Sequence, residues 1–237
     1  MGCDRVHSVP SFLDLRSFAD RAVASRTDAG AIGRWPLPLP PGPVTVGALL
    51  LPAGRHTTPA KAEDEFLVLH AGSASVEVEG VGHALSAGDA LVLSAGTRAH
   101  WQCAGDAVFL SMAYAKGTAG GGIVRIDPDA PLEPSGTPST DLLTTPVPSC
   151  RNHTDYRSGD GEFVCGTWDS TPYARKAMRY RHYELMHLLE GEVEFVDAAG
   201  VRARFSRGDI FLVRQGAECS WDSRVHVRKV YAIWRPA

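Results

Sequence analysis

The chain has 237 residues, and its 24 Lys and Arg against 27 Asp and Glu give a formal net charge of −3. This balance gives no reason to expect a nucleic-acid partner, and no stretch approaches the roughly 18 apolar residues of a membrane span. Hydrophobic residues make up 44% of the sequence, enough for the core of one large domain or two small ones.

Residues 1–43 are expected to form an extension ahead of the first domain, with one short helix within 10–23. The opening MGCDRVHSVPSF has no apolar core of a secretion signal, and Val6 stands where a myristoylation motif needs Ser or Thr. The cysteines are odd in number and form no CxxC pair, which is typical of reduced thiols, so we expect a cytoplasmic protein. They are Cys3, Cys103, Cys150, Cys165 and Cys219.

Two segments recur later in the chain. EDEFLVLHAGSASVEV (63–78) aligns with HYELMHLLEGEVEFVD (182–197), and GDALVLSAGTRAHW (88–101) aligns with GDIFLVRQGAECSW (208–221). Short apolar or alternating runs that end in Gly or Pro predict strands, and their close spacing favours a sandwich or barrel. The sequence therefore predicts a duplicated β domain.

We place the first copy at 44–115 and the second at 160–237. The Gly/Pro/Ser-rich stretch 116–159 between them is predicted to be a linker with one strand at GIVRID.

The spacing of glutamate and glycine within each copy resembles the two signature motifs of the cupins. These motifs are Glu-x6-Gly followed by Gly-Asp-x6-Gly. The second copy is similar to the cupin subfamily that includes ureidoglycine aminohydrolase and the EutQ-like proteins, on GTWDSTP (166–172), VRKVYAIW (227–234) and the pair Trp168 and Trp221. The resemblance implies an all-β bicupin, with tandem double-stranded β-helix barrels of the jelly-roll, RmlC-like type.

The resemblance also implies a metal site, which the residues do not complete. Metal cupins carry His-x-His shortly before the motif glutamate and another His three residues after the last glycine. Here 178–181 reads MRYR before Glu184, and Cys219 holds the later position. A catalytic metal usually has three protein ligands, so we expect no cofactor. The alternative is a divalent metal on His182, Glu184 and Cys219 with a further ligand.

Two histidines flank this glutamate in RHYELMHLLEGEVEF (181–195). Side chains alternate between the two faces of a strand. His182, Glu184 and Met186 should therefore share the inward face, and His187 should face outward or into an interface.

We predict Glu184, His182 and Tyr180 as catalytic residues and no metal ligands. The predicted ligand-binding residues are Glu184, Met186, Cys219, Trp221, Trp168, Lys229 and Glu65. Structural roles remain open for them: a hydrogen-bonded carboxylate, packed tryptophans, a small buried cysteine, and a salt bridge from Lys229 to Glu184 or Asp222. YARKAMRYRH (173–182) is consistent with an arginine site for an anionic small molecule or with a solvated edge.

These residues predict a small-molecule-binding cupin without the standard metal site. The alternative is a metabolic enzyme, aminohydrolase or isomerase-like, that acts on a small nitrogenous or carboxylate substrate in the second barrel. A metal-free reaction needs an acid–base pair such as His182 with Tyr180. The expected partners are a small-molecule ligand and a second copy in a homodimer, because sheet edges need covering. We expect neither a nucleic acid nor a membrane as a partner.

Overall fold

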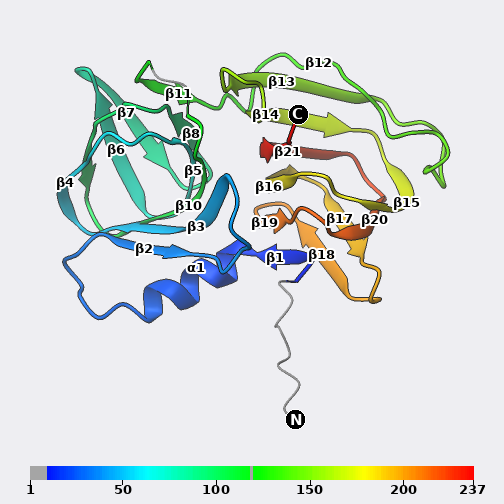
Figure 1. Cartoon of the computed structure of the whole chain (residues 1–237), viewed down its shortest axis with the longest axis horizontal. Helices are drawn as coiled ribbons and strands as arrows, with labels where there is room; N and C mark the ends of the chain where they lie inside the picture. Colours follow the sequence, from blue (N-terminus) through cyan, green and yellow to red (C-terminus); the bar gives the residue numbers. More distant parts are fainter. Residues whose placement is uncertain (1–9, 118–119) are drawn as a thin grey trace, which may run out of the picture.

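The computed structural model describes residues 10–117 and 120–237, and it shows two β-barrels side by side (Figure 1). The tandem jelly-roll architecture that the cupin resemblance implies is confirmed. Cys3 and the MGC motif lie outside the described residues. Across 10–117 and 120–237, no helix is long and apolar enough to cross a membrane.

Two antiparallel sheets form the first barrel, with strand orders β11-β8-β5-β10-β3-β2 and β4-β9-β6-β7. The strands are β2 (Gly33–Pro36), β3 (Val44–Leu51), β4 (Gly54–Thr58), β5 (Asp64–Ala71), β6 (Ser73–Val78), β7 (Val81–Ser86), β8 (Ala90–Leu93), β9 (Ala99–Cys103), β10 (Ala107–Tyr114) and β11 (Ile123–Arg125).

The second barrel repeats this arrangement, with orders β1-β19-β16-β21-β14-β13-β12 and β15-β20-β17-β18. Its strands are β1 (Phe12–Asp14), β12 (Glu133–Pro134), β13 (Cys150–Arg157), β14 (Phe163–Ser170), β15 (Tyr173–Arg179), β16 (Tyr183–Glu190), β17 (Glu192–Val196), β18 (Arg202–Ser206), β19 (Ile210–Val213), β20 (Glu218–Ser223) and β21 (Val227–Trp234). The stretch 116–159 thus supplies β11 to the first barrel's sheet and β12 and β13 to the second's.

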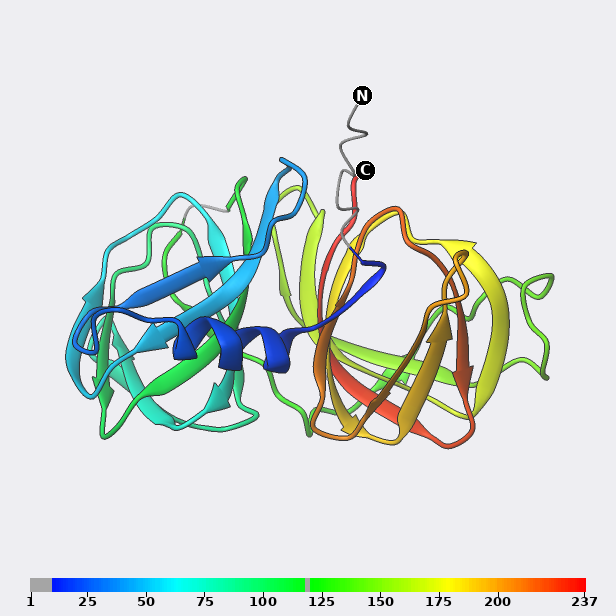
Figure 2. The same cartoon turned by 90° about the horizontal axis from the view of Figure 1, so that it is seen from below.

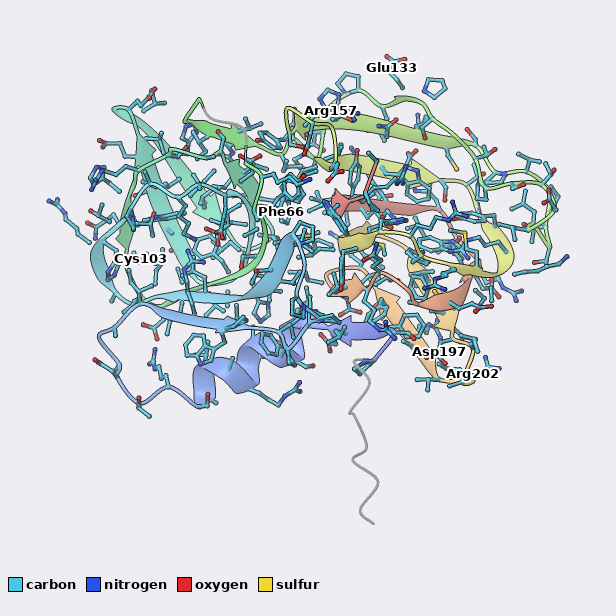
Figure 3. All side chains as sticks on the ribbon, in the orientation of Figure 1. Phe66, Cys103, Glu133, Arg157, Asp197 and Arg202 are labelled. Carbon is cyan, nitrogen blue, oxygen red and sulfur yellow. The ribbon has the colours of Figure 1, made fainter. Side chains whose placement is uncertain are left out.

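Alternation along the strands produces three apolar cores. One fills each barrel, and the third lies where the large sheets of the two barrels pack against each other. On β5, Leu67 and Leu69 point into the first barrel while Phe66 and Val68 join the shared core. Figure 3 shows Phe66 between the two barrels. Period-two burial on both faces explains why these strands read as continuous apolar runs.

The N-terminal segment connects the two barrels. Strand β1 pairs antiparallel with β19 of the second barrel, and α1 (Leu15–Ala24) then runs beneath the first barrel (Figures 1 and 2). The Asp14 carboxylate accepts hydrogen bonds from the backbone N–H groups of Arg16 and Ser17 and so caps the helix. The buried residues Leu15, Ala19 and Ala22 lie on one helical face.

The glycine that closes each motif hairpin has a steric reason to be there. Gly72 and Gly191 have φ of 84° and 76°, in the left-handed region. A Cβ at Gly191 would lie 2.1 Å from the carbonyl oxygen of His226. A side chain at this turn would therefore be strained and would also clash with the neighbouring loop.

Candidate functional site

The interiors of the two barrels differ in how they are filled. Leu49, Trp101 and Phe109 pack the first barrel's interior, whereas a cavity of about 510 Å³ opens into the second. Phe109 and Lys229 hold equivalent positions, because each stands four residues before the strand partner of its barrel's motif glutamate. An aromatic ring at this position closes one barrel, and an ammonium group at the other lines the cavity.

A buried ion pair lies at the centre of this cavity. The Lys229 Nζ atom on β21 lies 2.7 Å from Oε1 of Glu184 on β16, and His182 Nε2 lies 3.3 Å from Oε2. Both strands belong to the large sheet, so adjacent strands bring these side chains together. Lys229 and Glu184 are 6% exposed, and an unpaired charge at that depth would be costly.

The electrostatics of Glu184 follow from this pairing. Burial raises the pKa of the Glu184 carboxyl, but the adjacent Lys229 ammonium and the hydrogen bond to His182 outweigh it, so the pKa lies below its usual value. The carboxylate is therefore ionised at neutral pH, and the pair is a true salt bridge.

Arg175 on β15 is the second buried cation of the cavity, with 5% exposure. It donates to the backbone oxygens of Cys219 and Lys176, at 2.8 and 3.2 Å, and to the Tyr180 hydroxyl at 3.0 Å. Within the described part of the chain, no carboxylate oxygen lies within 4.0 Å of its guanidinium group. Its charge is thus held by neutral acceptors alone.

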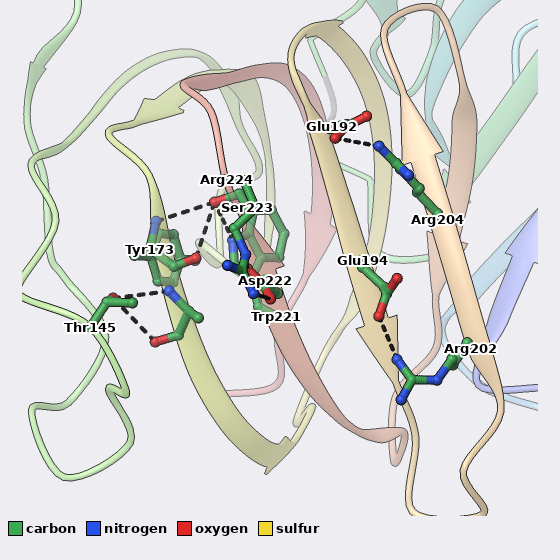
Figure 4. A network of polar contacts seen from close by, with 11 residues as sticks. Thr145, Tyr173, Glu192, Glu194, Arg202, Arg204, Trp221, Asp222, Ser223 and Arg224 are labelled. Carbon is green, nitrogen blue, oxygen red and sulfur yellow. Dashed lines mark hydrogen bonds and ion pairs between the residues drawn. The ribbon is translucent and has the colours of Figure 1, made fainter.

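Aromatic rings form much of the cavity wall. Tyr173 stacks on Trp221 at 5.6 Å between ring centroids, and Trp168 meets Trp221 edge-on at 6.0 Å. Figure 4 shows the polar contacts that hold this wall: Ser223 Oγ accepts from the Trp221 indole and from the Tyr173 backbone N–H. The same hydroxyl donates to the Tyr173 carbonyl. These contacts orient both rings.

The structure brings together most of the residues singled out from the sequence. Six of them line the cavity: Trp168, Tyr180, His182, Glu184, Trp221 and Lys229. The salt bridge expected for Lys229 forms with Glu184 and not with Asp222, which pairs with Arg224.

Two other predicted residues lie behind the wall. Met186 Sδ touches the Lys229 ammonium at 3.2 Å, and Cys219 is fully buried. Burial raises the pKa of the Cys219 thiol to about 11, so it stays protonated at neutral pH and is a poor nucleophile.

Glu65, the motif glutamate of the first barrel, lies apart from this cavity. Its oxygens accept from Arg34 at 2.6 Å and from Lys61 at 2.8 Å, beside a smaller cavity of about 240 Å³. Burial raises the pKa of Glu65, and the two cations lower it below the usual value. The carboxylate is therefore ionised at neutral pH and paired with two cations of the first barrel.

The histidine expected outside the barrel, His187, is buried between the two barrels near Gly88. Its Nδ1 atom has no hydrogen-bond partner among the described residues. His187 does not reach the cavity, as alternation along β16 predicts.

Arg175 is the cavity residue whose depth the sequence did not reveal. In the sequence it belongs to a cationic stretch with Lys176, Arg179 and Arg181, which are all exposed in the structure. A bulge between Arg175 and Met178 shifts the pairing of β15 with β20. Tyr231 was also missed; its position two residues after Lys229 on β21 is the signal that would have found it.

The cavity does not suit the metal that the cupin resemblance implies. Glu184 keeps a ligand position, but its two oxygens are bound by Lys229 and His182, and a divalent ion there would meet an ammonium group. In the residues that the structure describes, no three His, Cys, Asp or Glu side chains converge as a donor set. The donor chemistry therefore does not fit a resident divalent metal.

Comparison with known proteins places these barrels in a family. The family model for the EutQ-like cupin domain matches residues 157–231. A DUF861-family protein of unknown function from Pseudomonas syringae pv. tomato shares 30% identity and a TM-score of 0.76, over 81% of this chain and 82% of that one.

More distant structures share the fold alone. The protein Ylba from E. coli, also of DUF861, matches at 12% identity and TM-score 0.55, over 97% of this chain and 87% of its own. A salicylate 1,2-dioxygenase from Pseudaminobacter salicylatoxidans matches at 14% and 0.57, over 95% and 83%. No curated protein matches this chain.

Proposed function

We propose, from the premise that this chain belongs to the DUF861 family of cupins, that its second barrel binds a small organic anion without a metal. The observation that carries the proposal is Arg175. A guanidinium group that is buried beside a cavity without a carboxylate partner has an unmet preference for an anion, and carboxylates satisfy it in paired geometry.

The shape and chemistry of the cavity support this proposal. Its volume of about 510 Å³ lies in the range of small-molecule sites. The rings of Trp168, Tyr173 and Trp221 supply apolar contact area, and the Lys229 ammonium group, although paired with Glu184, adds a hydrogen-bond donor to the cavity wall. The ligand class is therefore a carboxylate with a planar or apolar body.

A thermal-shift screen of small carboxylates, ureides and sugars tests this function. Carboxylates should raise the melting temperature of the protein, and ligands that bind should lose about 10- to 100-fold in affinity in Arg175→Met. The exposed Arg179→Met is the matched control and should bind normally. If Arg175→Met binds as tightly as wild type, or if only uncharged compounds bind, the proposal fails.

A second candidate is an isomerase-like reaction by acid–base chemistry, favoured by the contact between Tyr180 and His182. Their ring centroids lie 5.0 Å apart at the cavity wall, and His182 is hydrogen-bonded to Glu184. Burial raises the pKa of Tyr180 well above its usual value, so the phenol is a proton donor and the imidazole the candidate base.

Exchange with solvent deuterium tests this candidate. A bound carboxylate with an acidic C–H should take up deuterium with wild-type protein and not with His182→Gln. A ligand that binds tightly and never exchanges would argue for binding alone. The aminohydrolase alternative predicts instead the release of ammonia from a ureide.

A further inference from the structure

The Lys229 ammonium group contacts four side chains. Glu184 Oε1 lies at 2.7 Å and Met186 Sδ at 3.2 Å, and the rings of Trp168 and Trp221 lie with centroids at 4.6 and 5.2 Å. A carboxylate and two aromatic faces attract a cation electrostatically, and the thioether sulfur adds a weak acceptor. The side chain is 6% exposed, so this surrounding replaces its hydration.

In the first barrel, the buried motif glutamate is neutralised by different residues. Its motif glutamate, Glu65, is neutralised from the barrel mouth by Arg34 and Lys61, whose side chains are 38% and 30% exposed. At the position equivalent to Lys229 it carries Phe109. A buried cation beside the motif glutamate is therefore a property of the second copy.

We propose that the Lys229 ammonium group takes the place of a metal ion in the second barrel: it occupies the position on Glu184 that a metal would need and presents its charge to the anionic oxygen of the ligand. The part that concerns the ligand rests on the proposed function. The part that concerns the cation does not, because it follows from the four contacts of the ammonium group.

Truncation of the lysine should turn its position into a binding site. Lys229→Ala removes three methylenes and the ammonium group, which are the atoms of n-propylammonium. The carboxylate, the thioether and the two rings remain around the space. Added n-propylammonium should then raise the melting temperature of Lys229→Ala in a concentration-dependent way and leave that of wild type unchanged. Neutral n-propanol should have no comparable effect.

Two control variants assign the effect to this site. Lys229→Ala combined with Glu184→Gln lacks the anchoring carboxylate and should not respond to n-propylammonium. Lys61→Ala, in the first barrel, removes a lysine whose glutamate keeps its bond to Arg34, and it should not respond either. A well-folded Lys229→Ala that ignores n-propylammonium overturns the proposal, as does an equal response from Lys61→Ala.

A measurement on the wild-type protein covers the case in which Lys229→Ala does not fold. After dialysis against Mn²⁺, Fe²⁺, Ni²⁺ or Zn²⁺, elemental analysis should find no stoichiometric metal. One metal per chain that is lost in Glu184→Gln overturns the proposal. Neither test uses a carboxylate ligand, so a failed carboxylate screen counts against the proposed function alone. Ligand binding that tolerates Lys229→Met unchanged counts against the cation as a ligand contact.

Discussion

At the scale of single residues, the two motif glutamates show how surroundings decide a role. Glu65 and Glu184 hold equivalent positions and both are buried, but their partners differ in depth. Arg34 and Lys61 reach Glu65 from the surface and stay partly hydrated, whereas Lys229 is as buried as Glu184 itself. The same carboxylate is a structural anchor in one barrel and part of a candidate site in the other.

This difference predicts unequal costs of neutralising each glutamate. Glu184→Gln leaves Lys229 as an uncompensated buried charge, which should lower the free energy of unfolding by about 3–5 kcal/mol. Glu65→Gln should cost clearly less, because the side chains of Arg34 and Lys61 are 38% and 30% exposed and can turn to water. Urea denaturation of both variants beside wild type provides the comparison; equal costs would show that depth of the partner does not matter here.

The pKa of Glu184 also predicts a pH dependence. Its folded value lies below the unfolded value of about 4.3, so the pair contributes stability that is present above that pH and is lost as the pH falls through the folded pKa. The stability difference between wild type and Glu184→Gln should therefore shrink on acidification below about pH 4. Urea titrations across that range test this, and a difference that stays constant contradicts it.

At the scale of elements, hairpins and a bulge position the site. The turn between β16 and β17 brings the backbone of Gly191 against the His226 carbonyl, while Gly200, in the next turn, has a similar φ of 79° and open space around its Cα. Both glycines have a left-handed backbone, but a side chain would clash with neighbouring atoms only at Gly191.

Alanine substitutions at Gly200 and Gly191 should therefore differ in how much they lower the free energy of unfolding. Gly200→Ala meets only the cost of a left-handed backbone, about 1 kcal/mol. Gly191→Ala meets that cost and a clash with backbone, and should be destabilised by more than Gly200→Ala, in the upper range of single substitutions at about 3 kcal/mol or above. Chemical denaturation of the two variants is the measurement, and equal losses would remove the steric argument.

Local sequence patterns are sufficient to predict the fold, but they do not predict the part of the site that lies on an irregular strand. Alternation placed Glu184 and Met186 on an inward face, because both lie on strand β16, and His182 has the same parity just before that strand. The burial of Arg175 was not predicted, because the bulge in β15 reverses the alternation of side chains. Before the bulge the odd-numbered Tyr173 and Arg175 face the cavity, and after it the even-numbered Met178 and Tyr180 do.

At the scale of the whole molecule, the packing of one barrel on the other buries a titratable group. His187 lies between them, where burial and the nearby Arg16 lower its pKa from 6.5 to about 4, with Asp209 opposing. The unfolded chain therefore binds a proton here at a higher pH than the folded protein does. The contact between the barrels therefore favours the neutral form of the His187 imidazole.

Mild acid should accordingly weaken the packing. The stability that a neutral His187 provides is present above pH 6.5 and is lost as the pH falls towards about 4, with a slope of up to about 1.4 kcal/mol per pH unit. His187→Leu should flatten this part of the stability profile, measured by urea unfolding at successive pH values. An unchanged slope in the variant would assign the acid sensitivity to other groups.

The pairing of the N-terminal strand with the second barrel constrains the order in which the chain can fold during synthesis. Strand β1 pairs with β19, so Phe12 must meet Val213. At about 5–20 residues per second, roughly 10–40 seconds of translation separate the two. The first barrel can be complete while its leading arm still waits for a partner. Proteolysis of ribosome-bound intermediates should find β1 protected only after β19 has emerged. Strand β1 can therefore link the two barrels only when the chain is nearly complete.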